Sequence, residues 1–197
     1  MDLQRIGIKI FADSSAPVPV REFIPIFHSW IQKQAVEEHL LIDVHNYSHI
    51  HNGPGILLVA GEGNFSIDMA DGQMGLLYYR KTPSAGLVSI LKTALQACNL
   101  LECEPNLAGR LRFRTDEMLI VANDRLHAPN NVETFEELKP ALSAALKLVL
   151  PEGKFAMTRS SVNPKDRLAI RVQTGQSENV AALLSRLNPT DARSRIS

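Results

Sequence analysis

Apolar residues alternate with other residues near the start of the chain and then recur at helical spacing. In residues 6–10, isoleucine occupies every second position, which is typical of a strand. Residues 21–34 instead place Phe27, Trp30 and other large apolar side chains on one helical face. Pro25 is compatible with this helix if it lies in the first turn, where its missing N–H is not needed. The pattern therefore predicts a strand followed by a helix.

The rest of the chain continues as strands with single helices between them. Asp71-Gly72 lies between two strand patterns and suits the positive φ angles of a two-residue type I′ hairpin turn. Residues 115–117 separate another pair of strand patterns, and Thr134 with Glu137 forms a capping box. We expect further strands at 40–50, 56–60, 64–70, 73–81, 110–114, 118–124, 154–160 and 167–173, and further helices at 84–101, 134–150 and 177–187.

This order of elements indicates the fold class. Consecutive strands joined by short turns favour antiparallel pairing over a doubly wound parallel sheet. We therefore expect an α+β fold, with antiparallel or mixed sheets packed by about four helices. Residues 1–104 and 105–190 follow a similar order, so they could be two βα-rich halves that share one core, or one single domain. Residues 191–197 are expected to form a frayed tail.

Composition and charge narrow the class of protein. The 197 residues carry 21 basic and 21 acidic side chains, so no basic surplus indicates nucleic acid or an anionic membrane as a partner. No apolar stretch approaches the roughly 18 residues of a membrane span, and no secretory signal pattern opens the sequence. The two cysteines form no disulfide framework, which fits a reducing compartment. We expect a cytoplasmic protein.

An aspartate and three histidines lie close together in residues 42–51. If this stretch is one extended strand, the odd-numbered positions share a face, and these include Asp43, His45, His49 and His51. Imidazoles spaced in this way can converge on zinc or another divalent metal and leave a position open for water. The sequence thus offers a candidate metal site, and a metal-assisted hydrolase or lyase centred on it is one alternative function.

The same residues also fit two interpretations without a metal. Asp43 could orient a histidine for general acid–base chemistry. Alternatively, the stretch is a half-exposed strand whose polar face meets solvent, since histidine suits such amphipathic positions. No nucleophile is marked elsewhere, because the sequence lacks a G-x-S-x-G elbow and a cysteine with a histidine nearby. No cofactor is expected unless the histidines bind a metal.

Glycines after this stretch offer a second candidate site. Gly53 and Gly55 precede the apolar run at 56–60, and the loop at 61–64 follows that run. A glycine-rich turn cradles phosphate when a helix N-terminus follows, whereas here the sequence predicts another strand. Tight turns are therefore the preferred interpretation, and a small-ligand binder that uses the two loops is an alternative.

Arginines alternate with apolar residues in two of the expected strands. Arg110, Arg112 and Arg114 share one face of the first strand, and Arg167 and Arg171 share one face of the second. If these strands are neighbours, they form an arginine-lined surface that could bind an anion, an acidic partner or RNA. RNA-binding sheets need exposed aromatic rings, and the aromatic residue here lies on the apolar face. A solvated surface is the simplest interpretation, an acidic partner comes second, and nucleic acid is not expected.

No motif in the chain assigns an activity, while the pattern that forms a core is strong. The favoured hypothesis is a non-enzymatic α+β domain that binds a protein partner or assembles with itself, most simply as a homodimer. Exposed sheet faces and edge strands are natural surfaces for such contacts. The metal-assisted enzyme and the small-ligand binder remain open as alternatives.

Overall fold

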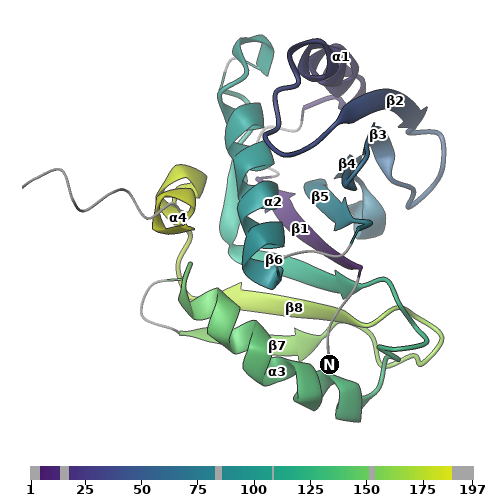
Figure 1. Cartoon of the computed structure of the whole chain (residues 1–197), viewed down its shortest axis with the longest axis vertical. Helices are drawn as coiled ribbons and strands as arrows, with labels where there is room; N and C mark the ends of the chain where they lie inside the picture. Colours follow the sequence, from purple (N-terminus) through teal and green to yellow (C-terminus); the bar gives the residue numbers. More distant parts are fainter. Residues whose placement is uncertain (1–4, 14–17, 83–85, 108, 151–153, 188–197) are drawn as a thin grey trace, which may run out of the picture.

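In the computed structural model of the chain, the strands of the described residues belong to one sheet (Figure 1). The structure describes residues 5–13, 18–82, 86–107, 109–150 and 154–187. The strand order is β2-β3-β4-β5-β1-β6-β8-β7, and all neighbours are antiparallel. The strands are β1 (Ile6–Ala12), β2 (Leu41–Tyr47), β3 (Gly55–Ala60), β4 (Gly63–Asp68), β5 (Gly75–Arg80), β6 (Phe113–Ala122), β7 (Phe155–Arg159) and β8 (Ala169–Thr174). The predicted α+β class is confirmed.

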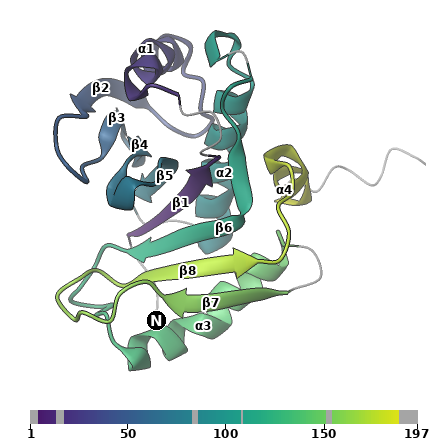
Figure 2. The ribbon, with the colours of Figure 1, turned by 180° about the vertical axis from the view of Figure 1, so that it is seen from behind.

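Four helices accompany the sheet within the described residues. They are α1 (Phe23–Lys33), α2 (Leu87–Glu102), α3 (Val132–Lys147) and α4 (Val180–Leu187). Helix α1 contacts β2 and β3, α2 contacts β1 and β5, and α4 contacts α2 and β6. Seen from behind in Figure 2, β1, β6 and β8 lie in front of α2 and α3, so these two helices cover one face of the sheet. None of the described helices has the length and apolar character needed to cross a membrane.

The buried apolar side chains form one cluster to which the whole described chain contributes. It includes Ile8 of β1, Leu91 of α2, Leu142 of α3 and Val172 of β8. Strand β1 pairs with β5 on one side and with β6 on the other, so the sheet continues without a break across residue 105. Two similar halves are not confirmed, and the boundary at that residue stays a prediction.

Several elements differ from their expected bounds, and for two of them the contacts give the reason. The strands expected on either side of residues 115–117 are a single strand, β6, because β1 and β8 pair along it and a register shift opposite β1 absorbs the polar interruption. Helix α3 begins before Thr134, because the Asn131 side chain accepts the Thr134 N–H and caps the helix. The start of the helix expected at 84–101 and the expected tail at 191–197 lie outside the described residues.

Candidate functional site

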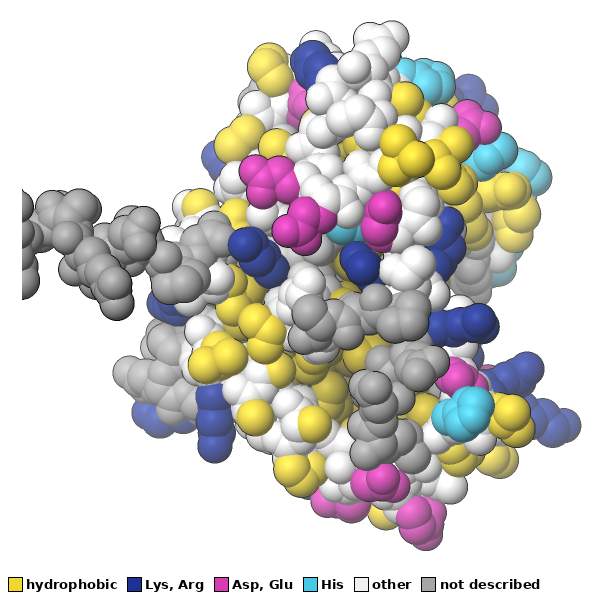
Figure 3. All heavy atoms as spheres, in the orientation of Figure 1, with side chains coloured by type: hydrophobic (Ala, Val, Ile, Leu, Met, Phe, Trp, Pro, Cys, Tyr) yellow, Lys and Arg dark blue, Asp and Glu magenta, His cyan; other side chains and the backbone are white. Residues whose placement is uncertain are grey.

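The histidine-rich stretch is a strand only in its first part. Strand β2 ends at Tyr47, and His49 and His51 lie in the turn that follows. The Asn46 side chain accepts the Ser48 N–H at 3.0 Å, which stabilises a turn directly after the strand. The prediction of one extended strand over residues 42–51 is therefore wrong beyond Tyr47. In Figure 3, histidine side chains gather at the upper right, over β2 and the loop to β3.

Asp43 and His45 do share a face of β2, as their spacing predicts. They oppose Val59 and Leu57 of β3, and His45 Nε2 lies 3.4 Å from Asp43 Oδ2. Both side chains are about half exposed. Within the described ranges, no group of three or more histidine, cysteine, aspartate or glutamate side chains is placed to hold a metal ion. The four predicted ligands are thus not brought together within this one chain.

The glycines at the end of this loop have a structural explanation. Gly55 adopts a φ of +61° where β3 begins, and a Cβ added there would lie 2.0 Å from the carbonyl oxygen of Ile67. Only glycine fits this close approach of two strands. A Cβ on Gly53 would meet the Ile50 side chain at 2.8 Å. Both positions are explained by the turn into β3, and ligand binding at these two glycines stays a prediction.

The predicted row of arginines is divided among separate ion pairs. Strand β6 begins only at Phe113, so Arg110 and Arg112 lie outside it. Arg110 pairs with Glu22, and Arg112 Nη1 lies 3.6 Å from Glu102 Oε2. The prediction that Arg110, Arg112 and Arg114 share one strand face is therefore wrong. Strands β6 and β8 are neighbours, as the arginine hypothesis required.

We call the face of the sheet away from α2 and α3 the open face. Its side chains come from strands that are distant in the sequence, so the sequence pattern alone did not predict that they are neighbours. Cross-strand pairing aligns its side chains in two neighbouring rows that run across the sheet. One row consists of Asp43, Val59, Asn64, Tyr79, Gly7, Val121 and Ala169, and the other of His45, Leu57, Ser66, Leu77, Lys9, Leu119, Arg171 and Thr158.

A buried ion pair lies near the middle of the open face. Lys9 Nζ donates to Asp68 Oδ2 at 2.5 Å and to the Ala70 carbonyl at 3.4 Å. Both side chains of the ion pair are almost completely buried. The Ala70 N–H also donates to Asp68 Oδ2, so the carboxylate has two donors. The charges of Lys9 and Asp68 compensate each other and leave no surplus here.

A second group of charges surrounds the Phe11 ring. Arg171 and Arg114 lie over this ring, with their Cζ atoms 5.7 and 5.9 Å from its centre. Glu117 lies between them, since it pairs with Arg171 and accepts from Arg114 Nη2 at 3.3 Å. These arginines therefore have a carboxylate partner within the protein.

Arg167 differs from these arginines, because its hydrogen-bond partners are neutral. Its Nη1 donates to the Tyr79 hydroxyl at 3.1 Å and to Asn123 Oδ1 at 3.3 Å. Arg5 lies close by, since its carbonyl accepts the Asn123 N–H. Among the described residues, neither Arg167 nor Arg5 forms an ion pair with a carboxylate. Burial raises the pKa of Tyr79 above its ordinary value, while the Arg167 guanidinium acts in the opposite direction.

These residues border a groove on the open face. Two hollows of about 610 and 1000 Å³ adjoin each other there. The loop residues Asn52 and Pro54 line one of them, and Arg125 and Lys165 line the other. We call the two hollows together the groove, and the residues that line both of them are Arg5, Asp68, Ala70, Leu77, Tyr79, Asn123 and Arg167.

One sequence signal marks the groove in retrospect. Gly7 interrupts the isoleucines of β1 and lies directly opposite Tyr79. A Cβ on Gly7 would lie 2.9 Å from the Tyr79 ring, so the ring packs flat against the strand backbone. Glycine inside a strand often marks such a close approach. The sequence shows the glycine, but the residue that approaches it depends on which strand pairs with β1.

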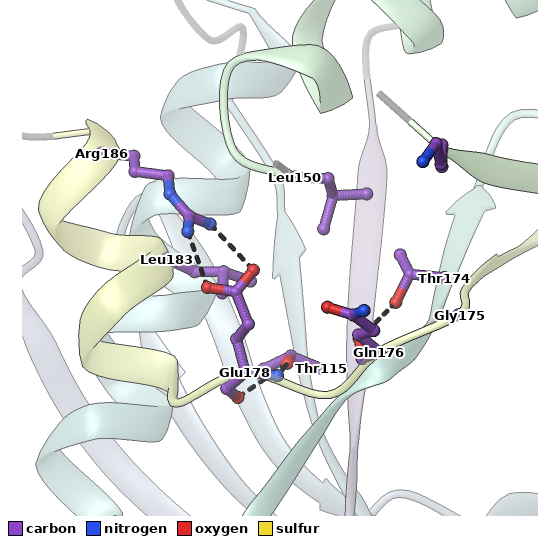
Figure 4. A pocket seen from close by; sticks show the side chains of 9 residues that line it. Thr115, Leu150, Thr174, Gly175, Gln176, Glu178, Leu183 and Arg186 are labelled. Atoms are coloured by element: carbon purple, nitrogen blue, oxygen red, sulfur yellow. Dashed lines mark hydrogen bonds and ion pairs between the residues drawn. The ribbon is translucent and has the colours of Figure 1, made fainter. Parts of the chain in front are cut away.

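A separate hollow of about 370 Å³ lies beside α4 (Figure 4). Glu178 and Arg186 line it and pair directly with each other, with Arg186 Nη2 2.6 Å from Glu178 Oε2. Thr115 Oγ1 donates to the Glu178 carbonyl and accepts the Glu178 N–H. These polar groups bond to one another and hold the start of α4 against β6. We attribute a structural role to them.

Comparisons of the chain with protein-family models, with curated proteins and with solved structures found no match. Inferences about function therefore start from the geometry of the open face.

Proposed function

We propose that the protein is a non-enzymatic binding domain whose open face holds an acidic, extended segment of a partner protein. The observation that carries this proposal is Arg167, an exposed guanidinium at the groove whose partners, Tyr79 and Asn123, are both neutral. A carboxylate from a partner can accept two parallel hydrogen bonds from such a group. Arg5 adds a second positive charge beside it.

The floor of the groove favours a segment of protein over a small anion. Leu57, Leu77 and Leu119 are only half buried there and lie in one row of the sheet. Apolar side chains of a bound peptide would cover these leucines, while its acidic side chains reach the arginines at the rim. The combined size of the two hollows fits an extended peptide.

The groove offers contacts for binding and little for catalysis. No histidine or cysteine is among the described residues that line its two hollows. Histidine is the most frequent general acid or base, and a cysteine thiolate is the most nucleophilic of the common side chains. Ser161 lines the wider hollow, and its hydroxyl donates to Asp166 at 2.6 Å. This hydrogen bond lies inside a surface turn, and we attribute a structural role to it.

Fluorescence anisotropy tests the proposal with a fluorescein-labelled peptide in which glutamate alternates with leucine and serine. Arg167→Gln removes the charge and is expected to weaken binding about tenfold or more, since a hydrogen bond to a charged group contributes about 1.5–3 kcal/mol. Arg110→Gln is the matched control, because Arg110 is already paired with Glu22 and does not line the groove.

Two further probes separate the other ligands that an arginine can attract. Inorganic phosphate should compete only weakly, and a single-stranded RNA oligonucleotide should bind less tightly than the peptide at the same salt concentration. Equal affinity of the wild type and Arg167→Gln for the peptide would contradict the proposal. Tighter binding of RNA than of the peptide would also contradict it.

A further inference from the structure

Among the described strands, β2 forms one edge of the sheet and has β3 as its single neighbour. Such an edge presents unpaired backbone groups to another chain unless charges or proline protect it. Asp43 is the one acidic residue of β2, and the strand has neither lysine nor proline. A register shift between Leu41 and Asp43 marks a bulge near one end of the edge. The remainder of the strand is regular enough to accept a further strand.

Side chains bond to the backbone groups of this edge at two positions, Leu41 and Val44. The Gln34 side chain donates to the Leu41 carbonyl and accepts the Leu41 N–H, both at 3.0 Å, as a neighbouring strand would. The Val44 N–H instead donates to Asp43 Oδ1 at 2.7 Å, which is the carboxylate of the preceding residue. At Val44, the backbone donor of the edge is therefore held by a side chain that a second strand can replace.

The sequence of β2 is complementary to itself about Val44. When two copies pair antiparallel with Val44 opposite Val44, Asp43 of each copy lies opposite His45 of the other. Directly opposite side chains lie on the same face of the sheet and contact each other. An imidazole N–H donates to a carboxylate in either protonation state of the ring. The pairing therefore forms two Asp43–His45 contacts between the copies, related by the two-fold axis.

Exposed apolar surface on β2 supports the same arrangement. Ile42 lies within the strand and is 54% exposed. In the register centred on Val44, Ile42 of one copy lies opposite Asn46 of the other. A second strand at this edge therefore covers apolar surface that a monomer leaves in water.

We propose that two copies of the chain form a two-fold dimer through β2–β2 pairing centred on Val44, closed by two Asp43–His45 contacts between the copies. The two-fold arrangement is closed, so it stops at two copies and does not continue into a fibre. The other edge strand, β7, lacks this complementarity, because pairing about Met157 places Phe155 opposite Arg159. The dimer uses the sheet edge and is independent of the groove that contains Arg167.

Analytical ultracentrifugation of the full chain over a wide range of concentration tests this proposal. The wild type is expected to show a monomer–dimer equilibrium of modest affinity, because a single strand pair buries little surface. Asp43→His places imidazole opposite imidazole, and His45→Asp places carboxylate opposite carboxylate. Each single variant loses both contacts and should weaken dimerisation about tenfold. The double variant exchanges the two residues, recreates both contacts and should restore the dimer.

Asp124 and His127 provide a matched control. They form another exposed aspartate–histidine contact, with His127 Nδ1 2.8 Å from Asp124 Oδ2, and they lie outside the strands. Exchanging these two residues should leave dimerisation unchanged, as should Arg167→Gln. A wild type that is monomeric at every concentration would overturn the proposal. A double exchange at 43 and 45 that dimerises no better than the single variants would also overturn it.

Discussion

Tyr78 and Tyr79 are neighbours in β5, yet they belong to two different environments. Tyr78 points into the core, where its ring stacks on Phe65 at 4.7 Å and its hydroxyl lies 2.7 Å from His39 Nε2. Tyr79 points to the open face, where its hydroxyl accepts a hydrogen bond from Arg167. The alternation of a strand places the two rings on opposite faces.

The comparison shows which partners the polar groups have on each face of the sheet. His39 Nδ1 lies 2.8 Å from the Glu37 carbonyl, which can only accept, so this nitrogen carries a proton. His39 Nε2 bonds to the Tyr78 hydroxyl, which also accepts from Arg80 Nη1 at 3.4 Å, so every polar group of the pair has a partner within the protein. Arg167 on the other face has neutral partners only, so its charge is available to a ligand. The contacts of the core pair explain the fold, and the charge of Arg167 is the basis of the proposed binding.

The largest expected effect comes from breaking the buried ion pair on the open face. Lys9→Met leaves the Asp68 carboxylate buried without its ammonium partner, and we expect the free energy of unfolding to fall by about 3–5 kcal/mol. Urea denaturation followed by circular dichroism measures this change.

The double variant Lys9→Met/Asp68→Leu is the control for this prediction. It removes both charges together, so stability should recover to near that of the wild type. A double variant as unstable as Lys9→Met alone would show that packing around the lysine, and not its charge, is what matters.

The two tyrosines give the next prediction. Tyr78→Phe removes the hydroxyl partner of His39 Nε2 and leaves a buried polar nitrogen unpaired, which should cost about 1–3 kcal/mol of unfolding free energy. Tyr79→Phe removes a partner of an exposed guanidinium, so its effect on stability should stay within about 0.5 kcal/mol. Thermal denaturation compares the two variants directly. Equal losses of stability would contradict the difference between the two faces of the sheet.

The smallest expected effect concerns the pKa of the Tyr79 hydroxyl. Burial raises the pKa of this phenol and Arg167 lowers it, so Arg167→Gln should raise the pKa further. NMR titration of 13C-labelled tyrosine measures the shift. A raised pKa means that the folded state favours the neutral phenol, so this contribution to stability is present below about pH 10 and is lost at higher pH. An unchanged pKa in the variant would show that the guanidinium does not interact with Tyr79 in solution.

Local patterns predicted the elements whose geometry depends on nearby residues. Asp71 and Gly72 have φ angles of 59° and 68°, as a type I′ turn requires, because the two residues decide that geometry themselves. The prediction of a two-residue hairpin loop is wrong, since β4 ends at Asp68 and β5 begins only at Gly75. Pro25 lies in the first turn of α1, where it fits. Asp43 and His45 share a face, since strand alternation holds over short distances.

Features that depend on distant partners were not predictable in this way. The end of β2 is decided by the Asn46 turn, and the alternation of polar residues continues past it. The joining of residues 115–117 into β6 depends on pairing with β1 and β8. The groove combines Tyr79, Arg167 and Asn123 from β5 and two loops, and only the strand order brings them together. Long-range pairing therefore limits what the sequence pattern can show.

The most direct test of the central claim is a two-dimensional NMR titration of the 15N-labelled protein with the glutamate-containing peptide. The amide signals expected to shift are those of Gly7, Leu77, Tyr79, Val121 and Asn123, which lie on the open face or border the groove. The signals of Ile90, Leu91 and other buried residues of α2 should stay in place. Shifts confined to the helices, or no shifts at all at saturating peptide, would contradict the account.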